Sequence, residues 1–143
     1  MKNKILFIFL LFIVFDCFSQ DFQLIEEIVS FIGKPLPNGL RRAGINTFVN
    51  DSNNMAFIVD NNIIISSSVS RLFDNIGIAN AWSSQYLEYF ENNGWVYLST
   101  ITRGYYFENI NLNLYALVGR AYRREDGIII ATIIIRRGNN LID

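Results

Sequence analysis

Apolar residues recur at helical spacing along the stretch from Asp21 to Ile32. They stand three or four positions apart, and polar side chains fall on the opposite side: Phe22, Ile25, Ile28, Val29 and Ile32 against Gln23, Glu26, Glu27 and Ser30. This period predicts an amphipathic helix. Gly33 suits its C-terminal end, and Pro35 and Pro37 prevent its continuation.

After residue 44 the apolar residues occur in short runs instead of at helical spacing. Three apolar runs, at residues 45–49, 55–59 and 63–66, are separated by clusters of Asn and Asp. Both residue types tolerate left-handed backbone and hydrogen-bond to their own main chain, so such clusters favour hairpin turns. We therefore predict a meander of three antiparallel strands.

Two further helices are predicted next. Ser66–Ser68 can cap a helix whose apolar stripe is Val69, Leu72, Phe73 and Ile76, and Gly77 would end it. A second helix is expected from about Asn80 to the left-handed stop at Asn93-Gly94, with an aromatic side formed by Trp82, Tyr86, Tyr89 and Phe90.

The rest of the chain is predicted to form strands. We expect strands at Trp95–Thr102, Leu112–Arg124 and Ile128–Arg137, while Tyr105–Asn109 is either a short strand or an irregular link. Residues 124–127 suit a type I turn with a left-handed Gly127 and a bulge.

The strands Leu112–Arg124 and Ile128–Arg137 are expected to form a hairpin, and the alternation of side chains along them predicts two chemically different faces. The face expected beneath a helix carries small and aliphatic residues: Leu117, Gly119, Ala121, Ala131, Ile133 and Ile135. The other carries a mixture of Arg, Tyr and aliphatic residues: Val118, Arg120, Tyr122, Ile130, Thr132, Ile134 and Arg136. Arg and Tyr are over-represented where a surface meets a partner. An alternative is that the Arg residues only solubilise an exposed sheet.

Because no strand–helix–strand alternation occurs, the predicted class is α+β, with an antiparallel meander sheet packed against two or three helices. This element order resembles cystatin-like and NTF2-like folds, in which helices pack against a curved meander. The resemblance concerns element order alone.

The N-terminus has the three parts of a secretory signal. Lys2 and Lys4 precede eleven apolar residues from Ile5 to Phe15, and Cys17-Phe18-Ser19 offers small residues for cleavage before Gln20. We expect residues 1–19 to be a signal peptide and 20–143 a single exported domain, periplasmic or secreted, with no membrane span after cleavage. A lipoprotein modified at Cys17 is the alternative; Asp16 directly before the cysteine disfavours it.

The composition excludes several kinds of catalytic and ligand-binding chemistry. The sequence has no His, and Cys17 is its only cysteine, so a mature chain without it lacks Cys–His and Ser-His-Asp machinery and the usual zinc ligands. Nucleotide-binding glycine loops are absent too. A net charge of −1 argues against a nucleic-acid partner. We expect no cofactor and no metal.

The candidate site residues are therefore aromatic and basic. Arg120, Tyr122 and Arg136 share the Arg/Tyr face, and Tyr105-Tyr106 belong to a run too aromatic to be wholly core. We expect a non-enzymatic binding module that holds a protein partner or a small apolar or anionic ligand. The alternatives are a cystatin-like or NTF2-like enzyme with an Asp/Glu/Tyr pocket, and a structural component of the cell envelope.

Overall fold

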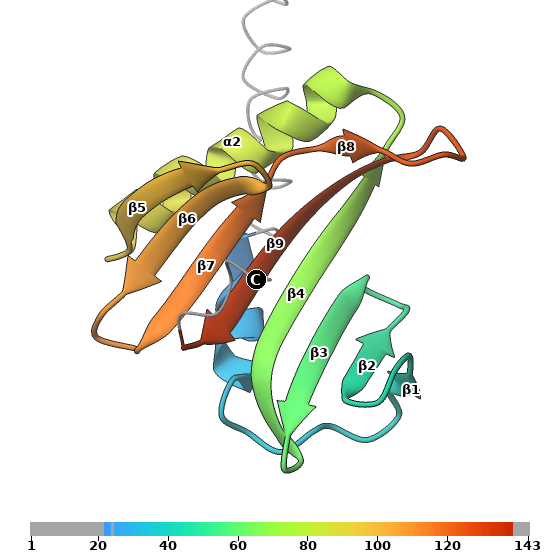
Figure 1. Cartoon of the computed structure of the whole chain (residues 1–143), viewed down its shortest axis with the longest axis vertical. Coiled ribbons are helices and arrows are strands. Elements are labelled where there is room, and N and C mark those ends of the chain that lie inside the picture. Colours follow the sequence, from blue (N-terminus) through green and yellow to red (C-terminus); the bar gives the residue numbers. More distant parts are fainter. Residues whose placement is uncertain (1–21, 24, 139–143) are drawn as a thin grey trace, which may run out of the picture.

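The fold is a mostly antiparallel sheet of nine strands with two helices, and so belongs to the α+β class (Figure 1). The computed structural model describes residues 22–23 and 25–138. The predicted signal peptide at 1–19, with Cys17 and the cleavage position, lies outside the described residues. Among those that are described, no helix is long and apolar enough to cross a membrane.

The N-terminal half follows the predicted pattern closely. A first helix covers residues 22–23 and 25–31, and Ile25 and Ile28 are buried. Four strands follow: β1 (Arg41–Arg42), β2 (Thr47–Asn50), β3 (Met55–Asp60) and β4 (Ile63–Phe73). The predicted meander is confirmed, and the Asn-rich turns carry the left-handed residues Asn54, Asn61 and Asn62.

The predicted helix at 69–76 is wrong, because residues 69–73 continue β4 and Ile76 already begins the next helix. Ser66–Ser68 lie in the middle of that strand, where Ser67 is buried and its hydroxyl donates to the carbonyl of Ile28 at 3.0 Å. β4 pairs with β9 (Ile129–Arg137) from Ser66 opposite Arg136 to Phe73 opposite Ile129. The backbone pairing with β9 thus stabilises a strand here, although the apolar residues of this segment have helical spacing.

The second helix begins earlier than predicted. α2 spans Ile76–Asn92, and its N-cap is Asn75, whose side chain accepts hydrogen bonds from the backbone N–H groups of Gly77 and Ile78. Gly77 lies in its first turn and does not end a helix. The predicted stop at Asn93-Gly94 is confirmed by the left-handed Gly94.

The C-terminal half returns to the sheet. β5 (Val96–Ile101), β6 (Gly104–Asn109), β7 (Leu114–Gly119) and the short β8 (Tyr122–Arg123) lead into β9. The sheet order is β1-β2-β3-β4-β9-β7-β6-β5, with β8 paired to β9. Gly127 has the predicted left-handed conformation in the β8–β9 turn.

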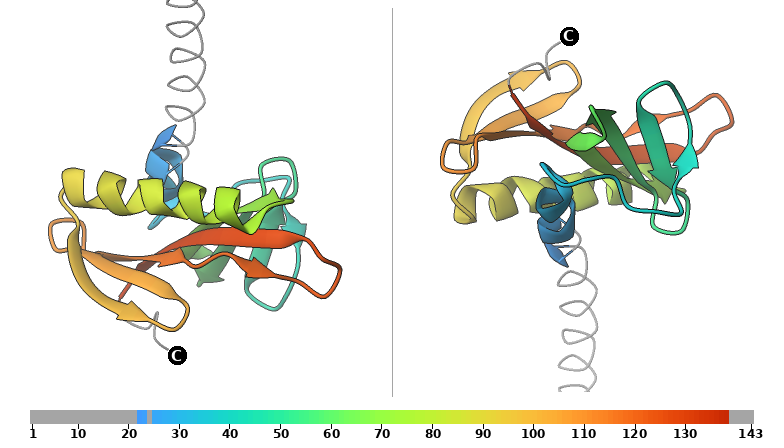
Figure 2. Two further views of the ribbon diagram at one scale, coloured as in Figure 1. Left: turned by 90° about the horizontal axis from the view of Figure 1, so that it is seen from above. Right: turned by 90° about the horizontal axis from the view of Figure 1, so that it is seen from below.

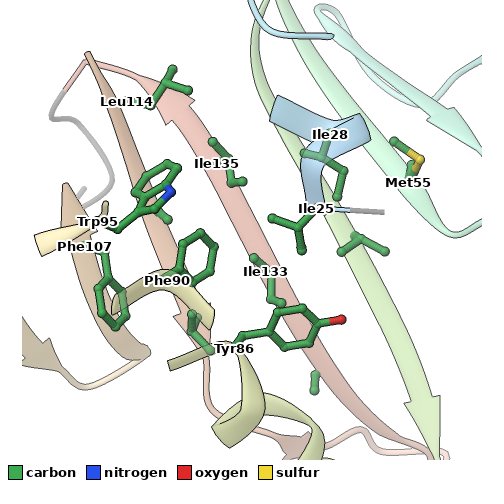
Figure 3. Close-up of a cluster of buried hydrophobic side chains, with 14 of the residues drawn as sticks. Ile25, Ile28, Met55, Tyr86, Phe90, Trp95, Phe107, Leu114, Ile133 and Ile135 are labelled. Carbon is green, nitrogen blue, oxygen red and sulfur yellow. The ribbon is translucent and has the colours of Figure 1, made fainter. Parts of the chain in front are cut away.

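Both helices cover the same face of the sheet, which we call the α2 face (Figure 2). Its core joins buried residues of the helices to buried residues of the strands, among them Ile25, Tyr86, Phe90, Phe107, Ile133 and Ile135 (Figure 3). The opposite face, which carries Ser68, Thr132 and Ile134, is called the open face.

A one-residue slip lies between β7 and β8. Tyr122 pairs with Ile130, but Val118 pairs with Ile133, so Arg120 and Ala121 leave the ladder. A one-residue slip moves side chains to the opposite face. The prediction for β9 is confirmed, since Ala131, Ile133 and Ile135 are buried in the α2-face core. The prediction for β7 is wrong: Val118 belongs to that core, and Leu117 lines a groove on the open face.

Candidate functional site

Two glycines bring two arginines together at the end of β6 and β7. Gly104 pairs with Gly119, and a Cβ on Gly119 would lie 2.8 Å from the carbonyl oxygen of Thr132. A Cβ on Gly104 would clash with the carbonyl oxygen of Val118, so the close approach of β6 to β7 depends on Gly104 and that of β7 to β9 depends on Gly119. Arg103 and Arg120 flank this pair, and the backbone N–H of Arg120 donates to the carbonyl of Arg103 at 2.9 Å.

A groove of about 650 Å³ lies beside the glycine pair on the open face. Leu117, Ile134 and Ala121 supply apolar surface, and Thr132 and Tyr122 add a hydroxyl each. The other lining residues come from the β5–β6 turn, the end of β7 and the β7–β8 link: Thr102, Arg103, Gly119 and Arg120. The hydroxyls of Thr132 and Ser70 are hydrogen-bonded at 2.9 Å, which holds the Thr132 side chain in place.

A second hollow of about 460 Å³ lies toward α2. It is lined mainly by polar residues: Asn80, Ser83, Ser84, Tyr105, Arg120 and Ala121. The guanidinium carbon of Arg120 lies 5.7 Å from the centroid of the Tyr105 ring, a cation–π contact. The Ser83 hydroxyl donates to the carbonyl of Gly119 at 3.2 Å and so fixes the β7–β8 link against α2. The two hollows share Arg120 and Ala121.

Arg120 and Tyr122 were expected side by side on one face, and this expectation is wrong. Tyr122 lies opposite Ile130 with 55 % of its surface exposed, and it lines only the open-face groove of the two hollows. The guanidinium of Arg120 lies instead over Tyr105, which packs against the α2-face core. Both residues line the open-face groove, but only Arg120 also lines the hollow beside α2.

Arg136 and Tyr106 belong to a different cluster farther along the open face. Arg136 pairs with Tyr115, whose ring stacks on Tyr106 at a centroid distance of 5.7 Å. The Tyr115 hydroxyl donates to Glu108 at 2.8 Å, and this hydrogen bond raises the pKa of Tyr115. Burial, with the nearby Glu108 charge, raises the pKa of Tyr106, while Arg136 acts in the opposite direction.

The groove and the hollow are electropositive. No acidic residue lines either of them. Within residues 22–23 and 25–138, ion pairs such as Arg41–Asp51 and Arg124–Asp126 do not involve Arg103 or Arg120. Ser84 donates to the carbonyl of Asn80 at 2.9 Å and is not activated by any base. Across residues 22–23 and 25–138, no three acidic side chains gather as a metal site.

Sequence reasoning missed several lining residues, above all Arg103 and Asn80. The signal for Arg103 was the mirrored order Arg103-Gly104 and Gly119-Arg120, which antiparallel pairing turns into two neighbouring arginines. Asn80 carried no signal, because its approach to Arg120 depends on how α2 lies across the sheet.

Comparison with known proteins gave no match to any protein-family model, curated protein or solved structure.

Proposed function

We propose that this chain is a small exported binding module without catalytic machinery, and that its binding surface is the open-face groove. The observation that carries the proposal is the composition of that groove. Leu117, Ala121 and Ile134 give it an apolar floor, and the margin is made of Arg, Tyr and Thr. Ligand sites are commonly concave and apolar with a few polar groups that fix orientation.

The proposal favours a ligand with an apolar body over a catalytic substrate. A groove that works as an enzyme site needs an acid, a base or a nucleophile within reach of the bound molecule. The acid–tyrosine pair formed by Glu108 and Tyr115 lies outside the linings of both hollows. Export remains part of the proposal and rests on the N-terminal sequence. The resemblance of the element order to cystatin-like and NTF2-like folds is also part of the proposal.

The proposal is tested with N-phenyl-1-naphthylamine, a neutral apolar dye that becomes fluorescent in an apolar site. The purified full chain should bind the dye saturably. Ile134→Trp places a large ring in the groove and should weaken dye binding at least about tenfold, because the space for the ligand is filled.

Ile58→Trp is the matched control. Ile58 is a 41 % exposed residue of β3 on the same face, and it lines neither hollow. This variant should bind the dye like the wild type. Absence of saturable binding to the wild type, or equal binding by both Trp variants, would refute the groove as the binding surface and leave a structural envelope role.

A further inference from the structure

Two hollows of opposite character meet at one interruption in the sheet. Arg120 and Ala121 belong to no strand, and both residues line the apolar groove on the open face and the polar hollow beside α2. A molecule held by both hollows needs an apolar part for one and a polar part for the other. It has to be an amphiphile.

The polar hollow is arranged for a negative group. The Arg120 guanidinium is oriented by the Tyr105 ring, and its backbone is fixed by the hydrogen bond to Arg103. Asn80 adds a side-chain amide that can donate, and no acid lines the space. A guanidinium presents a planar fork of N–H donors that matches a carboxylate in a bidentate pair. Because Arg120 is already oriented, little side-chain entropy is lost when it binds such a group.

The apolar part has a path on the open face. Beyond the groove floor, Tyr122 and Leu72 lie on either side of Ile130 as cross-strand neighbours, with 55 % and 54 % of their surfaces exposed. Covering them with a hydrocarbon chain removes apolar surface from water. In the other direction along β9 the face becomes polar at Glu108, Tyr115 and Arg136, which disfavours a hydrocarbon chain.

We propose that the ligand is a single-chain amphiphile with a carboxylate head. The head binds Arg120 on the α2 side of the interruption, and the hydrocarbon chain lies in the groove and over Tyr122. This inference rests on the binding function proposed above, to which it adds the class of ligand and its orientation.

The head group is tested by calorimetric titration of the purified full chain with dodecanoate and with dodecan-1-ol, each kept monomeric. Dodecanoate should bind at least about tenfold more tightly, the range of one charge-assisted hydrogen-bonded pair. Arg120→Gln should remove this preference and leave the affinity for dodecan-1-ol unchanged.

The location of the head is tested by a pair of isosteric changes on α2. Asn80→Asp adds a negative charge to the polar hollow and should weaken dodecanoate binding about threefold to tenfold, with dodecan-1-ol unaffected. Asn92→Asp makes the same change at the other end of α2, outside the hollow, and should alter neither affinity. Both variants should melt within a few degrees of the wild type, since both positions are exposed.

Four results overturn the inference. Equal affinities for dodecanoate and dodecan-1-ol refute the anionic head while the apolar groove stands. Loss of the preference in Arg103→Gln but not in Arg120→Gln or Asn80→Asp places the head on the open face. Arg120-dependent binding to phosphatidylglycerol vesicles without binding of monomeric dodecanoate makes the occupant a membrane surface. Failure to bind either amphiphile or the neutral dye removes the proposed function itself.

Discussion

Gly104→Ala tests how closely β6 and β7 approach at the site. A Cβ on Gly104 would clash with the carbonyl oxygen of Val118 and would lie 2.9 Å from the Cα of Gly119, whereas ordinary contacts begin near 3.4 Å. Both obstacles are backbone, so neither can rotate away. The strands must separate, which combines an overpacking cost of roughly 1–3 kcal/mol with weakened ladder hydrogen bonds of about 1 kcal/mol each.

We therefore expect Gly104→Ala to lower the free energy of unfolding by about 3 kcal/mol, or the melting temperature by about 10 °C in a domain of this size. Urea denaturation monitored by circular dichroism measures it. Gly44→Ala, whose Cβ would lie 3.5 Å from Thr47, should cost almost nothing. Gly94→Ala meets no atom within 4 Å but has φ +80°, so it should cost about 1 kcal/mol. A loss below about 1 kcal/mol for Gly104→Ala would mean that the approach of the strands is not as close as the structure has it.

Four further predictions address the core, the groove, the tyrosine cluster and processing. Ile133→Ala should cost roughly 2–5 kcal/mol in denaturation, since Ile133 is fully buried in the α2-face core. Tyr122→Ala should keep the free energy of unfolding within about 0.5 kcal/mol and weaken dye binding, since Tyr122 is exposed in the groove. Glu108→Gln should lower the pKa of Tyr115 toward its ordinary value in an absorbance titration, because the Glu108 carboxylate favours the protonated phenol. The stability linked to the raised pKa of Tyr115 is present below about pH 10 and is lost as the pH rises through the folded-state pKa. N-terminal sequencing of exported protein should begin at or near Gln20, and a mature start at a lipid-modified cysteine would contradict this.

Local patterns predicted the elements whose neighbours are close in the chain. The first helix, the meander of β2, β3 and the start of β4, and the β8–β9 turn all depend on contacts within a few residues or between adjacent strands. The left-handed Asn61, Asn62 and Gly127 sit where turn chemistry places them. These parts of the fold could be derived from side-chain spacing and turn residues alone.

The middle of β4 could not be derived in that way. Val69, Leu72, Phe73 and Ile76 have helical spacing, and a serine triplet before them is a good helix cap. What decides the strand is distant: Ser67 donates to the carbonyl of Ile28, and β9 pairs with the segment from the far end of the chain. Only the tertiary structure places these partners beside it.

The candidate site was predicted in part because its residue types were recognised while their grouping was not. Arg120, Tyr122 and Tyr105 do line the two hollows, but Arg136 and Tyr106 lie with Glu108 and Tyr115 instead. Alternation along a strand assigns faces correctly only while the ladder is uninterrupted. Nothing in the sequence Gly119-Arg120-Ala121 indicates whether this segment pairs in register with β9 or contains an extra, unpaired residue.

That extra residue is what gives the site two chemically different sides. In the register of β7, Arg120 lies on the side of Val118 and of Tyr105, the cross-strand partner of Val118, and Tyr122 would lie on that side as well. The slip leaves Arg120 over Tyr105 and moves Tyr122 to the open face, over the apolar groove. The small side chains around it serve the same end, because Gly104 and Gly119 allow the strands to close beside the break. The site's polarity therefore depends on backbone geometry at three consecutive residues, and a binding defect without loss of stability is expected from changes at Arg120 and not from changes at Gly104.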